Sequence, residues 1–347
     1  MQSILVNSKI EGKILLLSDY DKIADKREFL LYSDNILEGI TLLNYLTQSD
    51  DLLKFTGVVY EPIDQPIYVF TDSDNNNYGI KICGSFDKWQ LPDDVNAIKS
   101  FVDLPDYIFY SVATKKAILA GENTETASVG NSQWQREGRK VASARVGVPF
   151  IYQTFYSGKD ESQDTIREPN SLQVYNQLFY SARYKTASFV AYFENNFDGS
   201  KTRSRTPVDS QKLFARYIKS VLLTDTDVKN LPIKIELEKE FFSHMVSYIK
   251  EGKYKGSNGG TVETSARILK DLPSIHSNTK NGILNNSSEF VDDLIDWIYS
   301  ISNNFETKYS ISDLDYTKLV DWNPSLKAIN KKQVQPLLDY FSRIGKP

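Results

Sequence analysis

The sequence predicts an α/β (α+β) protein, in which a mixed β-sheet is flanked by helices and is followed by a mostly helical C-terminal region. Short aromatic and β-branched runs, typical of buried strands, alternate with helical segments up to about residue 205. From about residue 207 the apolar residues follow a mostly helical period. Hydrophobic residues make up 40% of the chain and aromatic residues 12%, which is enough to build a folded core.

A chain of 347 residues exceeds the usual size of a single domain, so we expect more than one structural unit. Changes in composition and periodicity suggest three regions. They are an N-terminal α/β region over residues 1–95, a central core over residues 96–205 and a helical C-terminal region over residues 206–347. In the last region we expect helices at residues 207–223, 235–250, 262–269, 288–302 and 333–344.

The N-terminal region is expected to hold a buried strand at residues 13–18 and two further strands at residues 57–60 and 67–71. Between them, residues 34–46 show a helical period, with Asp34 as the expected N-cap and Glu38 as an acid on the polar side. Residues 72–77 are a polar segment between two apolar runs. We expect a hairpin tip there, because the glycine and distal glutamate of an EF-hand are absent.

Composition excludes several classes of site. With 1 cysteine and 2 histidines, a zinc site built from cysteines, a histidine-based metal site and a Ser-His triad are all disfavoured. No apolar run has the length of a transmembrane helix, and residues 1–7 lack the pattern of a signal peptide, so we expect a cytoplasmic protein with no membrane partner. The net charge of −4 argues against a non-specific nucleic-acid binder but is compatible with a local basic cleft.

The central region contains the stretch around which the chain is organised, residues 105–152. Residues 107–110 are aromatic and β-branched and residues 117–120 are continuously apolar, so both are predicted strands joined by a turn. A helix is expected from about residue 132 to 145, and residues 148–152 form the next buried strand.

Two carboxylates flank this hairpin. Asp106 opens the first strand and Glu122 follows the second, so antiparallel pairing would bring them to one edge of the sheet. Converging carboxylates form a hard oxygen site that suits Mg²⁺, which can activate water and bind a phosphoryl oxygen. In the alternative interpretation, Asp106 only begins a strand and Glu122 is a solvated turn residue.

The helix after the hairpin is rich in amides and cations. Arg136 and Lys140 are expected on one face and Gln135 and Arg139 on another, with Gln133 nearby. Apolar residues on the opposite side, Trp134, Val141 and Ala142, would pack against the sheet. The helix could therefore turn cations toward a phosphate, although a solvated helix face is the alternative.

The sequence Pro105-Asp106, followed by Glu122-Asn123-Thr124, resembles the PD-(D/E)XK nuclease superfamily, particularly type II restriction endonucleases. The resemblance covers about residues 100–155 and implies a restriction-endonuclease-like core. It also implies Mg²⁺ held by Asp106, Glu122 and the backbone carbonyl of Asn123. Thr124 departs from the pattern, since the family usually has lysine there. Residues that could replace this lysine are Glu125, Gln133, Gln135 and Lys140.

The resemblance implies Mg²⁺-dependent hydrolysis of double-stranded DNA by a sequence-specific enzyme, with a homodimer matching a palindromic target. Expected DNA contacts come from the helix and from an alternating basic segment: Arg136, Arg139, Lys201, Arg203 and Arg205. A solvated linker is the alternative for the basic segment. The rival function, favoured by Thr124, is a non-catalytic nucleic-acid-binding or assembly protein on a nuclease-like fold. A nuclease acting on RNA or another target is the third alternative.

Overall fold

The structure is a computed structural model that describes residues 14–47, 51–60, 65–84, 86, 90–99, 104–124, 136–156, 158–159, 166–167, 171–194, 209–251, 285–300 and 304–309. The chain forms two compact units. The first consists of Met1–Asn96, Leu104–Gly121 and Thr206–Leu237, and the second of Ala97–Asp103, Glu122–Arg205 and Glu238–Pro347. The boundary within the central region falls inside one strand, between Gly121 and Glu122.

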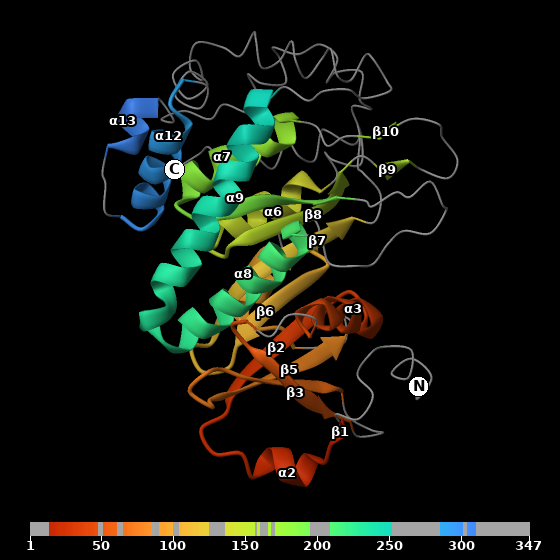
Figure 1. Ribbon diagram of the computed structural model, residues 1–347. Coiled ribbons are helices and arrows are strands. Elements are labelled where there is room, and N and C mark those ends of the chain that lie inside the picture. The colour runs from red at the N-terminus through yellow and green to blue at the C-terminus, as the bar shows by residue number, and fades with distance from the viewer. Residues whose placement is uncertain are drawn as a thin grey trace. The chain divides into compact units, whose positions relative to one another are not determined.

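The first unit is built on a mixed sheet, as the sequence predicts. Its strands run in the order β1 (Ile14–Leu15), β3 (Lys54–Val59), β4 (Ile67–Thr71), β5 (Asn77–Gly84), β2 (Arg27–Ser33), β6 (Tyr107–Ser111) and β7 (Lys116–Thr124) (Figure 1). β2 is parallel to β5 and antiparallel to β6, which is in turn antiparallel to β7. The expected strands near residues 57–60 and 67–71 and the hairpin tip at residues 72–77 are confirmed.

Helix α3 (Ile36–Leu46) packs on β2 and β5 of this sheet and also contacts α8 (Asp209–Thr226). The predicted N-cap was one residue early: Asn35, not Asp34, accepts the backbone N–H of Glu38, at 3.0 Å. Glu38 is exposed, as a residue on the polar side should be. Other helices of this unit are α2 (Leu17–Asp21), the start of α4 (Asp93–Lys99), the 3₁₀ helix η2 (Val228–Asn230) and the start of α9 (Leu231–Glu251).

The expected buried strand at residues 13–18 is wrong. Only Ile14 and Leu15 pair, as β1 at the edge of the sheet, and α2 begins at Leu17. Ile14 and Leu16 are 69% and 67% exposed, whereas Leu15 and Leu17 are partly buried and pack against a core cluster that includes Tyr20. An apolar run indicates side chains that can be buried where other elements cover them. This segment lies at the edge of the sheet, so part of the run stays exposed.

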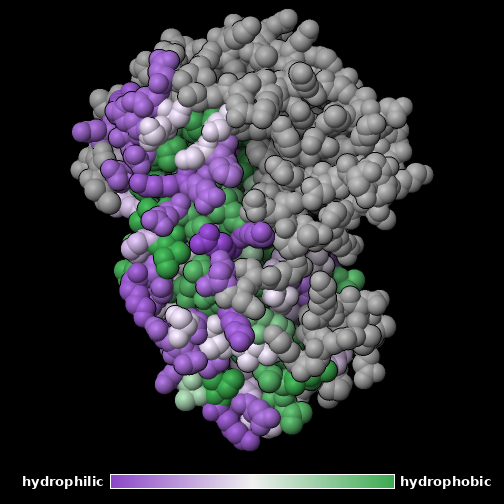
Figure 2. All heavy atoms as spheres, in the orientation of Figure 1, coloured by the Kyte–Doolittle hydropathy of each residue, from purple (hydrophilic) through white to green (hydrophobic). Residues whose placement is uncertain are grey.

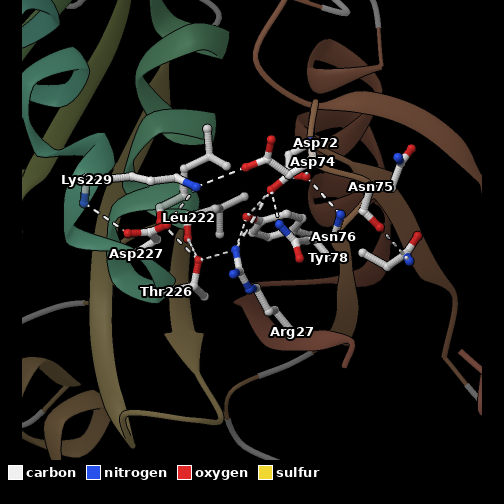
Figure 3. Close-up of polar contacts among 12 residues, drawn as sticks. Arg27, Asp72, Asp74, Asn75, Asn76, Tyr78, Leu222, Thr226, Asp227 and Lys229 are labelled. Atoms are coloured by element: carbon white, nitrogen blue, oxygen red, sulfur yellow. Dashed lines mark hydrogen bonds and ion pairs between the residues drawn. The ribbon is translucent and has the colours of Figure 1, made fainter. Parts of the chain in front are cut away.

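A polar network joins the β4–β5 hairpin to the end of α8 (Figure 3). Arg27 of β2 donates from Nη1 to Thr226 Oγ1 at 2.8 Å and also donates to the Tyr78 hydroxyl. Asp72, in the hairpin turn, accepts the Tyr78 hydroxyl proton at 3.0 Å. Lys229 of η2 reaches Asp74 of the same turn at 2.9 Å. These contacts tie segments that are far apart in sequence.

The second unit continues from β7 through β8 (Phe150–Tyr156) to β11 (Ser188–Glu194). β8 and β11 are parallel, with Phe150 opposite Ser188 and Tyr156 opposite Glu194. Helix α6 (Glu137–Arg145) connects β7 to β8 and packs on β8, and α7 (Ser171–Tyr184) connects β8 to β11 and packs on β11. Between β8 and α7, the strands β9 (Gly158–Lys159) and β10 (Ile166–Arg167) form a small antiparallel pair.

Aromatic contacts between β11 and α9 form part of the core of this unit. Phe189 of β11 lies 4.9 Å from Phe241 and 4.7 Å from Phe242, both on α9, measured between ring centroids. Helix α12 (Ser287–Ile298) docks on α7 and is followed by α13 (Phe305–Tyr309). Hydrophilic residues cover the outward side of α12 and α13 at the upper left of Figure 2. Among the described helices, none has both the length and the apolar character needed to cross a membrane.

Within the described part of the C-terminal region, the expected helical character is confirmed by α8, α9, α12 and α13. The expected helices at residues 262–269 and 333–344 lie outside the described residues.

Candidate active site

The β6–β7 hairpin sets the positions of the two predicted carboxylates. Its register runs from Ser111 opposite Lys116 to Tyr107 opposite Gly121. Asp106 directly precedes Tyr107 and Glu122 directly follows Gly121, so each acid stands one residue beyond the same ladder pair. Asp106 belongs to the first unit and its backbone carbonyl accepts the N–H of Asp34, at 3.2 Å. The hairpin itself confirms the predicted pair of strands.

The position of Glu122 within its strand differs from the prediction. The sequence suggested that the strand ends at Gly121, but β7 continues to Thr124. Gly121 is required by packing rather than by a turn, because a Cβ there would lie 2.1 Å from the hydroxyl oxygen of Tyr107. Glu122 is therefore part of an extended strand, and its side chain is held rigidly rather than solvated in a turn.

Glu122 is buried and bound by two cations. Its side chain is 1% exposed, and Arg136 Nε donates to Oε1 at 2.6 Å. Arg139 Nη1 donates to Oε2. Arg136 is the residue just before α6 and Arg139 lies in its first turn, so the start of this helix is clamped to β7 through Glu122. The alternative of a solvated turn glutamate is excluded, because a carboxylate with so little exposure has exchanged water for these hydrogen bonds.

Lys140 does not point toward solvent as the helix-face prediction expected. It is fully buried, and its Nζ lies 4.5 Å from the centre of the Tyr152 ring on β8. Val141 and Ala142 are buried as predicted. The buried face of α6 therefore includes Lys140 in addition to the predicted apolar residues. The lysine stem is apolar, and its ammonium group can be accommodated on an aromatic ring.

Several predicted site residues lie outside the described residues. They are Gln133, Gln135, Lys201, Arg203 and Arg205, together with Trp134 and Glu125. Asn123 lies in β7 and is partly buried, and the backbone of Thr124 ends that strand. The structure therefore brings Glu122, Arg136 and Arg139 together and places Asp106 by the register of the hairpin alone.

Mg²⁺ is a hard cation that binds oxygen ligands. Asp106, Glu122 and the Asn123 carbonyl offer oxygen atoms, the ligands that Mg²⁺ prefers. Each Glu122 oxygen accepts a single hydrogen bond here, and each retains a second lone-pair site. In the described part of the chain, no three His, Cys, Asp or Glu side chains cluster as a metal site. A bound cation would share Glu122 with the arginines.

Sequence reasoning missed the pairing of Glu122 with Arg136 and Arg139. A glutamate followed by two arginines on the next helix was visible, but the sequence does not reveal how a helix packs on a strand. It also missed Gln153 of β8, which is buried and whose Oε1 has no hydrogen-bond partner in the described structure. No sequence signal marked Gln153, since it follows a buried aromatic in an otherwise apolar strand.

Comparison of the chain with family models, curated proteins and solved structures gives no match.

Proposed function

We propose that this protein is a Mg²⁺-dependent endonuclease that hydrolyses phosphodiester bonds of double-stranded DNA, in the manner of a sequence-specific type II restriction endonuclease. The observation that carries the proposal is the surroundings of Glu122: a buried carboxylate beside an acid-bearing hairpin end, bound by two arginines of the following helix. Carboxylates and guanidinium groups placed together can serve a cation and a phosphate at once.

The order of elements supports a restriction-endonuclease-like core. β2, β6 and β7 are antiparallel neighbours, α6 follows β7, and the parallel strands β8 and β11 are connected through α7. Asp106 directly precedes β6 and Glu122 lies in β7, and this order along the chain supports the resemblance.

The proposed roles follow from position. Asp106, Glu122 and the Asn123 carbonyl would hold Mg²⁺, which when bound lowers the pKa of water and stabilises charge on the phosphate. Arg136 and Arg139 would contact the DNA backbone as well as Glu122. Lys140, the other residue considered in place of the missing lysine, is buried with its Nζ 4.5 Å from the centre of the Tyr152 ring, and its proposed role is instead to position α6 against β8. The proposals that Gln133 and Gln135 replace the missing lysine, and that Lys201, Arg203 and Arg205 bind DNA, rest on the sequence.

A non-catalytic nucleic-acid-binding protein is the second candidate. It is favoured by the two ion pairs on Glu122, which neutralise the carboxylate and would serve equally well as a purely structural clamp. It is also favoured by Thr124 at the position where the resembling family has lysine.

Cleavage of mixed-sequence plasmid DNA in the presence of Mg²⁺ tests the proposal. Wild type should give discrete fragments, and both Asp106→Asn and Glu122→Gln should give none. Glu236→Gln, which changes an exposed acid on α9, is the matched control and should cut as wild type does. Circular dichroism must show that each variant is folded. If folded wild type binds DNA but does not cut it, the second candidate replaces the first, and equal cutting by all variants would move the active site elsewhere.

Two further parts of the proposal need separate tests. Light scattering with and without DNA tests the proposed homodimer, which would match a palindromic target. Fractionation of cells tests the proposed cytoplasmic location.

A further inference from the structure

We draw no further inference here: the strongest candidate, the buried Gln153 side chain on β8 of the second unit, has an Oε1 atom without a hydrogen-bond partner in the described structure, but nothing within the described residues shows which ligand or partner would bind to it.

Discussion

The ring of Tyr107 lies directly across Gly121 in the β6–β7 ladder, and a Cβ at Gly121 would lie 2.1 Å from its hydroxyl oxygen and 2.2 Å from Cζ. Tyr107 is buried, so its ring has little room to move. We expect Gly121→Ala to lower the free energy of unfolding by about 1–3 kcal/mol, the usual cost of overpacking. Urea denaturation measures this change.

A double-mutant cycle identifies the cause of that loss. In a Tyr107→Ala background the methyl group at position 121 has space, so Gly121→Ala should cost much less there. Equal costs in the two backgrounds would show that the ring is not what excludes a side chain at position 121.

The ion pairs of Glu122 predict how much stability the single and double arginine variants lose. Either arginine alone can partly compensate the buried carboxylate, so Arg136→Gln and Arg139→Gln should each be tolerated. Removing both leaves an unpaired buried charge, and the double variant should lose about 3–5 kcal/mol, more than the sum of the single losses. Adding Glu122→Gln to the double variant should restore part of this stability, since the carboxylate is then neutral. If guanidinium chloride unfolding shows that the triple variant is less stable than the double variant, an unpaired Glu122 carboxylate is not the cause of the loss.

Asp72 should make the stability of the first unit sensitive to acid. Partial burial alone would raise its pKa, but hydrogen bonds from the Asn76 side chain and backbone, the Tyr78 hydroxyl and the Asp74 N–H outweigh burial, and the pKa lies below its usual value of 3.8. A carboxyl group with a lowered pKa in the fold stabilises the protein above its unfolded pKa, and this contribution is lost as the pH falls through the folded pKa.

Asp72→Asn is the corresponding test. The variant should be less stable than wild type at neutral pH, because the amide cannot accept all the hydrogen bonds that the carboxylate accepts. Between about pH 5 and pH 3, its unfolding free energy should fall less steeply than that of wild type. Parallel slopes in urea titrations over this interval would show that Asp72 has a similar pKa in the folded and unfolded chains.

Trp297 anchors α12 to α7 in the second unit. Its Nε1 donates to the backbone carbonyl of Ala182 at 2.7 Å, and the contact is buried. Trp297→Phe removes the donor and leaves the carbonyl unsatisfied, so we expect a loss of about 1–3 kcal/mol. Hydrogen exchange should show faster exchange in α12 than in β8. Unchanged protection of α12 would mean that the hydrogen bond does not determine its docking.

Much of the secondary structure could be predicted from the sequence. The β6–β7 hairpin, helix α6 and strand β8 lie close to the predicted residues, because aromatic and apolar runs bounded by polar segments reflect burial directly. The strand predicted at residues 13–18 was too long for the same reason, because Ile14 and Leu16 are apolar but remain exposed.

The candidate site was only partly predictable. The acids Asp106 and Glu122 could be proposed from their place beside two strands, and antiparallel pairing explains why the hairpin gives them neighbouring positions. Lys140 could not be assigned correctly, because helical periodicity places a residue on a face but does not say how far the neighbouring strand covers that face.

The sequence by itself determined the β6–β7 hairpin, the helix and strand that follow it, and the identities of the acids and cations, because these depend on local periodicity and residue chemistry. Tertiary structure alone decided that Glu122 is buried between Arg136 and Arg139, and that Arg27 connects the Asp72 hairpin to Thr226. Such contacts join residues distant in the chain. Their geometry depends on how helices pack against the sheet, which no local pattern of residues specifies.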